Sequence, residues 1–255
     1  MPTGLQGKAV IITGGASGIG RATALAFAGQ GAKVFIATAR SLTAAEETVA
    51  QIKALGGEAV FCQCDVSSEA SVAAMVAKAV GAFGRVDFAF NNAGVGADGV
   101  TLPFLPLAEL PEADFDCVID TNLKGVFLCM KHEIRQMRAQ GGGVIINTSS
   151  TSANHVMPGF GAYPAAKSGI NVLTKLAAVE NRDAGIRANV VAPGPTKGTG
   201  MSDRLLSAMK PGEGPPVHLM GTAEQVADVV VWLCSEEAAF VNGNIISVDG
   251  GLDIA

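Results

Sequence analysis

Short apolar segments alternate along the chain with longer segments in which apolar residues recur every three or four positions. The short segments are predicted strands at residues 8–13, 33–37, 58–62, 87–90, 144–148, 187–192 and 244–248. Each is almost continuously apolar and rich in β-branched residues. This pattern is typical of parallel strands that are covered on both faces.

Helices are predicted between these strands. The clearest one runs from Ser68 to Phe83 and carries its apolar residues on one face. A capping box of Thr222 and Gln225 marks the start of the last helix. The other helical segments follow the first strand and cover about 43–55, 112–139 and 162–183. The repeated units predict an α/β fold with a doubly wound, Rossmann-like parallel sheet. Because no repeat or linker divides it, the whole chain 1–255 is predicted to be one domain.

The composition agrees with a sheet that is buried on both faces. Of the 255 residues, 49% are hydrophobic, and the mean hydropathy is +0.36. No segment reaches the roughly 18 uninterrupted apolar residues of a membrane-spanning helix. The first residues lack the basic and then apolar layout of a signal peptide. We therefore expect a cytoplasmic protein without membrane contact.

The charged and sulfur-containing residues exclude two kinds of site. The formal net charge is −5 and no basic stripe is present, so no nucleic acid partner is expected. The five cysteines lie in apolar segments without a second ligand pair, so no metal site is predicted. They are interpreted as buried structural thiols, at Cys62, Cys64, Cys117, Cys129 and Cys234.

A glycine-rich turn follows the first predicted strand. Gly14 permits a tight turn, Gly18 allows the backbone to approach a pyrophosphate, and Gly20 allows close packing of the next helix. A strand, a glycine turn and a helix in this order predict a dinucleotide site. The helix N-terminus would attract the phosphates.

Tyr163 is the only tyrosine of the chain, and it stands four residues before Lys167 and thirteen after Ser150. Residues four apart share one face of a helix, so the Lys167 ammonium can favour the ionised form of the phenol. A group with an ordinary pKa of about 10 would then exchange protons near neutral pH. Ser150 ends a buried strand and can direct its hydroxyl to the same point. The three residues predict acid–base chemistry, although a Tyr and a Lys at this spacing are also common surface neighbours.

Several motifs in one order resemble the short-chain dehydrogenase/reductase family. They are TGGASGIG at 13–20, NNAG at 91–94, Asn122, Ser150, Tyr163 with Lys167, PG at 193–194 and DGG at 249–251. The resemblance covers nearly the whole chain and is to the short, single-domain NAD(P)-dependent branch. It implies an oxidoreductase that interconverts a secondary alcohol and a ketone by hydride transfer.

The resemblance implies four catalytic residues. Tyr163 would exchange a proton with the substrate oxygen, and Ser150 would stabilise charge developing on that oxygen. Lys167 would lower the pKa of Tyr163 and hold the ribose hydroxyls of the cofactor. Asn122 would support a water that relays protons to Lys167, or would cap a local helix irregularity. The four-residue interval from Tyr163 to Lys167 disfavours the enoyl-reductase branch, which uses a longer one.

The resemblance also implies the cofactor site. The contacts would come from Gly14, Ser17, Gly18, Ile19, Gly20, Thr38, Arg40, Asp65, Val66, Asn91, Ala93, Gly94, Tyr163, Lys167, Pro193, Gly194, Thr196 and Thr199. Asp65 and Val66 would border the adenine, and Asn91, Ala93 and Gly94 the ribose. The loop after Pro193 and Gly194 is one residue longer than the family pattern. Either Thr196 or Thr199 would therefore contact the nicotinamide amide.

The end of the second strand bears on the choice of cofactor. Enzymes that prefer NAD usually carry an acid there, which binds the ribose 2′-hydroxyl and repels a 2′-phosphate. Here the position is Thr38, and Arg40 can bind a phosphate. Ser17, in contrast, stands where NADP enzymes often carry a basic residue. NADP(H) is favoured, with NAD(H) as the alternative.

The substrate is predicted only as a class. Residues 195–220 contain several Gly and Pro and the apolar Met201, Leu205, Leu206 and Met209, which suggests a mobile lid over an apolar pocket. With no cluster of Arg or Lys, a small neutral ketone or secondary alcohol is expected. Two alternatives stay open: an enzyme like 3-oxoacyl-[acyl-carrier-protein] reductase, and a cofactor-binding regulatory protein without catalysis.

Two helical segments, 116–130 and 165–179, are apolar around most of their circumference. One stripe facing the sheet does not require so much apolar surface. Similar family members pair such helices between subunits. The chain is therefore predicted to form a homotetramer, with a dimer as the alternative.

Overall fold

The centre of the fold is a seven-stranded parallel sheet. The computed structural model describes residues 3–96, 102–208 and 220–252. The strand order is β3-β2-β1-β4-β5-β6-β9, and every neighbouring pair is parallel. The strands are β1 (Ala9–Thr13), β2 (Lys33–Thr38), β3 (Glu58–Gln63), β4 (Phe88–Asn91), β5 (Gly143–Thr148), β6 (Ile186–Pro193) and β9 (Ile245–Val248). This order confirms the doubly wound, Rossmann-like fold.

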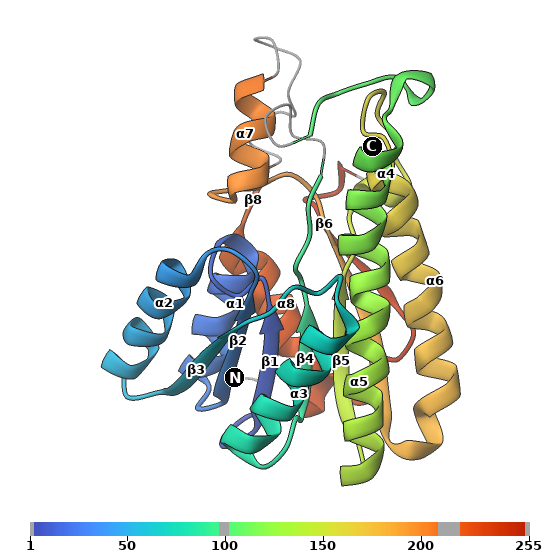
Figure 1. The fold of residues 1–255 in the computed structure, drawn as a ribbon. Helices are drawn as coiled ribbons and strands as arrows, with labels where there is room; N and C mark the ends of the chain where they lie inside the picture. Colours follow the sequence, from blue (N-terminus) through green and yellow to red (C-terminus); the bar gives the residue numbers. More distant parts are fainter. Residues whose placement is uncertain (1–2, 97–101, 209–219, 253–255) are drawn as a thin grey trace.

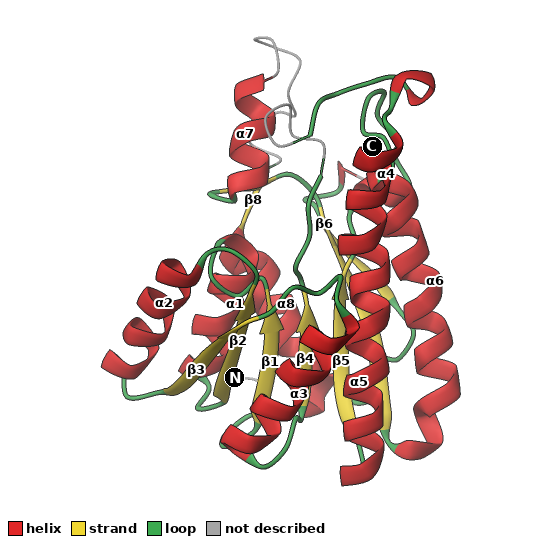
Figure 2. Cartoon of the chain, in the orientation of Figure 1, coloured by secondary structure: helices red, strands yellow, loops and turns green. Residues whose placement is uncertain are grey.

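Helices cover both faces of the sheet, as Figure 2 shows for the yellow strands between red helices. One face packs against α1 (Gly18–Gly29), α2 (Leu42–Ala54) and α8 (Ala223–Cys234). The other packs against α3 (Glu69–Phe83), α5 (Gly125–Gln140) and α6 (Tyr163–Asn181). The predicted capping box opens α8, where the Gln225 N–H donates to Thr222 Oγ1 and the Thr222 N–H donates to Gln225 Oε1.

Strand β1 illustrates why the strand segments are apolar throughout. Val10 and Ile12 belong to the core under α1 and α8, whereas Ile11 belongs to the core under α3 and α5. Successive side chains of a strand point to opposite faces, so both sets must be apolar. Full burial of one such side chain stabilises the fold by about 1.5–3 kcal/mol.

The predicted helix at 112–139 is two helices joined by a wider turn. α4 (Glu112–Val118) continues into a π-helical segment (Ile119–Lys124) and then into α5. Short 3-10 turns lie at Leu107–Glu109, Thr151–Ala153, Arg182–Ala184 and Glu236–Ala238. Among the described helices, none combines the length and the apolar character needed to cross a membrane.

The predicted lid contains regular structure of its own. Its described part comprises β7 (Thr196–Lys197), α7 (Gly200–Ala208) and β8 (Gly221–Thr222), and β7 pairs with β8 in a separate two-stranded sheet. Figure 1 shows α7 above the carboxyl ends of the strands. Residues 209–219 of the lid, including Met209, lie outside the described residues.

Candidate active site

The glycine turn lies where β1 meets α1. Gly14 and Gly18 adopt left-handed backbone conformations, with φ of +66° and +49°, which residues with a side chain rarely adopt. A Cβ on Gly20 would collide with the carbonyl oxygen of Gly14. Ser17 is exposed just before the helix, and Ile19 is half-buried against the core. The turn thus presents bare backbone beside a helix N-terminus, as a pyrophosphate site requires.

The end of β4 lies beside this turn. Thr13 Oγ1, at the end of β1, accepts hydrogen bonds from the backbone N–H groups of Asn92 and Ala93, at 3.0 and 3.1 Å. β1 and β4 are neighbours in the sheet, but the chain leaves them toward opposite faces. Such a reversal opens a crevice at the carboxyl ends of the strands, where α/β sheets bind ligands.

Ser150, Tyr163 and Lys167 meet at the carboxyl end of β5. Tyr163 begins α6, and its hydroxyl shares a hydrogen bond with the Ser150 side chain. Lys167 is buried one turn later, with its Nζ 5.5 Å from the centroid of the Tyr163 ring. The same Nζ donates a 2.7 Å hydrogen bond to the backbone carbonyl of Thr148. The three side chains that the sequence singles out therefore lie together.

Burial determines the protonation of this cluster. Removal from water raises the pKa of the Tyr163 phenol, and the hydrogen bond with Ser150 opposes this increase only in part. Burial also lowers the pKa of the Lys167 ammonium to about 8. In the protein alone Lys167 does not offset this increase, because it loses its proton first. That Lys167 lowers the pKa of Tyr163 when the cofactor is bound stays a prediction.

Asn122 lies in the π-helical segment. Its side chain is buried and pairs twice with the backbone of Val95: Oδ1 accepts from the N–H at 2.8 Å, and Nδ2 donates to the carbonyl at 2.6 Å. A Cβ on Gly94 would lie 3.1 Å from Asn122 Oδ1 and 3.8 Å from Lys167 Nζ. Asn122 therefore lies near Lys167 and also within the helix irregularity that was its alternative interpretation. Its part in a proton relay stays a prediction.

The residues expected around the adenosine follow β2 and β3. Thr38 ends β2 and is buried, whereas Arg40 is exposed. Asp65 Oδ1 accepts hydrogen bonds from the Ser67 hydroxyl at 2.7 Å and the Ser67 N–H at 3.0 Å. These bonds lower the pKa of the Asp65 carboxyl, and the charge of Arg40 adds to the effect. Val66 is buried, so Arg40 and Asp65 supply the charges at this end of the crevice.

Asn91 directs its side chain into the core rather than along the ribose. Its Nδ2 donates to Glu133 Oε2 at 2.9 Å and to Asn147 Oδ1 at 3.0 Å. Only the backbone of Asn91 can border the predicted ribose site. Ala93 and Gly94 are less buried and remain compatible with that site.

The two threonines after Pro193 and Gly194 occupy different positions. Thr196 is buried, and its Oγ1 donates to the carbonyl of Gly194 at 2.9 Å. Thr199 packs against the glycine turn, since a Cβ on Gly18 would lie 3.3 Å from Thr199 Cγ2. The geometry therefore brings Thr199, and not Thr196, next to the turn.

Three contacts of the catalytic cluster are not evident from the sequence. A Cβ on Gly96 would lie 3.0 Å from Cδ2 of the Tyr163 ring and 3.3 Å from Met201 Sδ, so this glycine leaves room for both. The sequence marks Met201 as part of the lid but nothing marks Gly96. The carbonyl of Thr148, which holds Lys167, belongs to the backbone and has no sequence signal.

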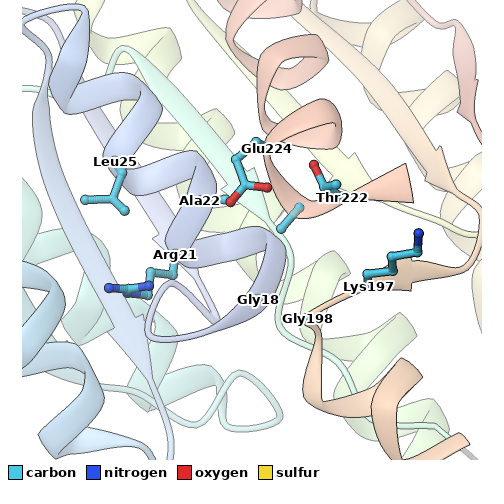
Figure 3. A pocket seen from close by; sticks show the side chains of 9 residues that line it. Gly18, Arg21, Ala22, Leu25, Lys197, Gly198, Thr222 and Glu224 are labelled. Atoms are coloured by element: carbon cyan, nitrogen blue, oxygen red, sulfur yellow. The ribbon is translucent and has the colours of Figure 1, made fainter. Parts of the chain in front are cut away.

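A cavity of about 300 Å³ opens beside the glycine turn (Figure 3). It is lined by Gly18, Arg21, Ala22 and Leu25 of α1, by Lys197 and Gly198, and by Thr222, Ala223 and Glu224. None of the catalytic candidates reaches it. A second cavity, of about 740 Å³, is lined by Lys8, Phe88, Gly143 and Ile186 at the amino ends of the strands. This cavity lies at the opposite end of the strands from Ser150 and Tyr163.

The cysteines and other metal-binding side chains are scattered. Among the described residues, no group of three or more His, Cys, Asp or Glu side chains could hold a metal ion. Cys117 is exposed, contrary to the expectation of buried thiols, because α4 buries only Val118. The other four cysteines are buried.

Comparison with known proteins identifies relatives along almost the whole chain. A family model described as enoyl-(acyl carrier protein) reductase matches residues 14–253. The short chain dehydrogenase/reductase astE of Aspergillus oryzae is 43% identical over 257 residues, which are 98% of this chain and 96% of that protein. The 2,5-dichloro-2,5-cyclohexadiene-1,4-diol dehydrogenase of Sphingobium indicum is 38% identical over 253 residues, or 97% of each chain.

A solved structure agrees with these relatives. The crystal structure of levodione reductase matches with a TM-score of 0.89 and 35% identity, over 98% of this chain and 99% of that one. The chain therefore belongs to the short-chain dehydrogenase/reductase family of oxidoreductases.

Proposed function

We propose that this enzyme interconverts a secondary alcohol and a ketone with NADP(H), using Tyr163 as the acid and base. The main support is the contact of the half-buried Ser150 and Tyr163 with the buried Lys167, close to the crevice between β1 and β4. The glycine turn fits a dinucleotide, because Gly14 and Gly18 hold left-handed backbone conformations beside the N-terminus of α1. When bound, the cofactor supplies or accepts the hydride.

Ser150 and Tyr163 can act together on the substrate oxygen. Ser150 Oγ accepts a 3.1 Å hydrogen bond from the Ser152 N–H, and its own hydrogen, which bonds the Tyr163 hydroxyl in the protein alone, can turn to a substrate oxygen. During ketone reduction, negative charge develops on the substrate oxygen, and the Ser150 hydroxyl stabilises it. Tyr163 is protonated at neutral pH because its pKa is raised, so it can donate its proton to that oxygen. In alcohol oxidation the proton moves in the reverse direction.

Lys167 is suited to restore the proton of Tyr163. Its pKa of about 8 lies close to neutrality, so both protonation states are accessible. Its Nζ is held by the Thr148 carbonyl at the end of β5, close to the phenol. Thr148 Oγ1 is buried without a hydrogen-bond partner in the described structure, which leaves a polar atom at the same strand end for a bound group.

The preference for NADP(H) rests on the end of β2. Thr38 is uncharged, so no carboxylate at this position repels a 2′-phosphate. Arg40 is exposed and can reach a phosphate. Asp65 interacts with Arg40, but Ser67 already occupies one oxygen of its carboxylate. The test of this assignment is whether Arg40→Ala loses the preference for NADPH over NADH.

The substrate is proposed to be a small, neutral and cyclic ketone or alcohol. Val156 and Met157 are exposed apolar residues shortly after Ser150, and Met201 of α7 lies beside Tyr163. One relative is named for a cyclohexadiene diol, which supports a ring. The interval from Tyr163 to Lys167 favours alcohol and ketone chemistry over the enoyl reduction named in the matching family model.

The experiment is a screen of NADPH and NADH oxidation against cyclic ketones, linear ketones and a 3-oxoacyl thioester. We expect turnover of cyclic ketones with NADPH. A strong preference for the thioester would move the assignment to an acyl-carrier substrate. Absence of turnover with every acceptor would support the regulatory alternative.

The oligomer is proposed to form through α4, α5 and α6. Phe115 and Phe127 are exposed on α4 and α5, and Val172, Leu176 and Val179 are exposed on α6. The most exposed of the five is Val172, at 67%. Their exposure supports a homotetramer in which these five side chains are buried between subunits, with a dimer as the simpler form.

A further inference from the structure

A polar cluster is buried in the core beneath the catalytic strands. Glu133 of α5 is 0% exposed, and Asn91 of β4, Asn147 of β5 and Thr174 of α6 are buried with it. Asn147 Nδ2 donates to Thr174 Oγ1 at 2.8 Å and contacts Met130 Sδ at 3.1 Å. The cluster therefore joins two strands to two helices, and the proposed reaction uses none of these side chains.

The cluster lacks one hydrogen-bond donor. Asn91 Nδ2 uses its two hydrogens on Glu133 Oε2 and Asn147 Oδ1. Within the described part of the chain, the second atom of each group, Glu133 Oε1 and Asn91 Oδ1, has no hydrogen-bond partner. Each is an acceptor when Glu133 is ionised. Two unpartnered acceptors on groups already paired through their other atoms indicate a missing proton.

Among the residues that the structure describes, no positive charge compensates an ionised Glu133. Its neighbours from β4 and β5 are the amides of Asn91 and Asn147, and the neighbour from α6 is the Thr174 hydroxyl, bonded to Asn147. On α5 itself the titratable neighbour is Cys129, whose thiol pKa is raised by burial and by Glu133. Within the described structure, no lysine, arginine or histidine contributes to the pKa of Glu133.

We propose that Glu133 is a neutral carboxylic acid in the folded enzyme and donates the proton of Oε1 to Asn91 Oδ1. The carboxyl and carboxamide groups then satisfy each other through two hydrogen bonds, and the proton comes from solvent as the chain folds. Burial raises the pKa of Glu133 to about 7, against the opposing effect of the Asn91 hydrogen bond.

This pair is a positioning device for the site. β4 continues from Asn91 into the segment whose Val95 pairs with Asn122. β5 continues from Asn147 to Thr148, whose carbonyl holds Lys167. A charge on Glu133 would disturb the ends of both strands. The inference concerns protonation and stability, so it stands independently of the proposed substrate and cofactor.

Replacement of Glu133 by Gln tests the proposal, because the amide offers one donor and one acceptor in the places of the neutral acid. Glu47→Gln, the same change at an exposed position of α2, is the control. Urea unfolding from pH 5 to pH 9 gives the folding equilibrium constant of each variant. The folding equilibrium constant of the wild type divided by that of Glu133→Gln isolates the titration of Glu133.

The expected sign follows from the raised pKa. Below the unfolded value of about 4.3 both states carry the proton, so the acid contributes its full stability. As the pH rises toward 7, the unfolded chain ionises first. The ratio should therefore fall about tenfold per pH unit between about pH 5 and pH 7 and level off above it. The control ratio should not follow this profile, and a constant ratio for Glu133→Gln would overturn the proposal.

Infrared spectroscopy provides the second measurement and does not depend on how the variant folds. At pH 6 the folded wild type should show the carbonyl band of a buried carboxylic acid, because exposed carboxyl groups are then mostly ionised. The band should disappear as the pH passes about 8 while circular dichroism shows that the protein is folded. Absence of the band at pH 6 would mean that Glu133 is ionised and the proposal is wrong.

Discussion

Replacement of Lys167 by Met tests how the lysine and the tyrosine share protons. The Lys167 Nζ lies 5.5 Å from the centroid of the Tyr163 ring. At this distance, and with an effective dielectric constant of about 20, a unit positive charge stabilises a tyrosinate by about 3 kcal/mol, or about 2 pKa units. If Lys167 were charged while Tyr163 titrates, its removal would raise the pKa of Tyr163 by that amount.

The structure supports the opposite order of titration. Burial lowers the pKa of Lys167 to about 8 and raises that of Tyr163 above its ordinary value of 10.0. Lys167 is then mostly neutral at the pH where Tyr163 ionises, and a neutral amine stabilises a phenolate only weakly. For the protein alone we expect a wild-type midpoint above about 10. Lys167→Met should leave this midpoint nearly unchanged.

An ultraviolet difference titration measures this midpoint directly. Tyr163 is the only tyrosine, and the indole of Trp232 has no ionisation in the same range. Tyr163→Phe supplies the blank, and circular dichroism at each pH verifies the fold. A wild-type midpoint below 10, or a rise of about 2 units in Lys167→Met, would refute the argument from burial. In the complex with oxidised cofactor, the positive nicotinamide ring should lower the midpoint, and an unchanged value would place the ring away from Tyr163.

Three further predictions follow from the described contacts. Arg40→Ala should lower kcat/KM for NADPH about tenfold and leave that for NADH nearly unchanged, because one charge-assisted hydrogen bond contributes about 1.5 kcal/mol; equal kinetics in both variants would exclude Arg40 from the site. Gly20→Ala should destabilise the fold by about 1–3 kcal/mol and abolish cofactor binding measured by calorimetry, since its Cβ meets the carbonyl of Gly14, whereas Gly29→Ala in the same helix has nothing within 4 Å and should retain both. Leu176→Glu should dissociate the oligomer in light scattering, and a wild-type monomer at micromolar concentration would contradict the proposed assembly.

Much of the fold could be predicted because it depends on local patterns. Strands buried on both faces must be apolar throughout, so segments such as 144–148 and 187–192 are visible as runs in the sequence. The glycine turn could also be predicted from the sequence, because Gly14 and Gly18 adopt backbone angles that favour glycine. Side chains that recur at fixed spacing, such as Tyr163 and Lys167, could be placed on one helix face.

The features that the sequence did not predict depend on contacts between residues that are distant along the chain. The π-helical segment around Asn122 has the composition of an ordinary helix, and the Val95 backbone that pairs with it is far away in the sequence. The inward direction of Asn91 depends on Glu133, which the helical pattern alone does not mark as buried and polar. The pKa of Tyr163 depends on desolvation of two groups at once, which spacing does not determine.

The most direct test of the proposed function is the rate of NADPH consumption with a cyclic ketone, measured for the wild type and for Tyr163→Phe. The phenylalanine ring preserves the packing against Gly96 and removes only the hydroxyl. The proposal predicts turnover by the wild type and a loss of at least about 100-fold in kcat for the variant, with NADPH binding unchanged. A variant that retains wild-type turnover would contradict the assignment of Tyr163 as the acid and base of this enzyme.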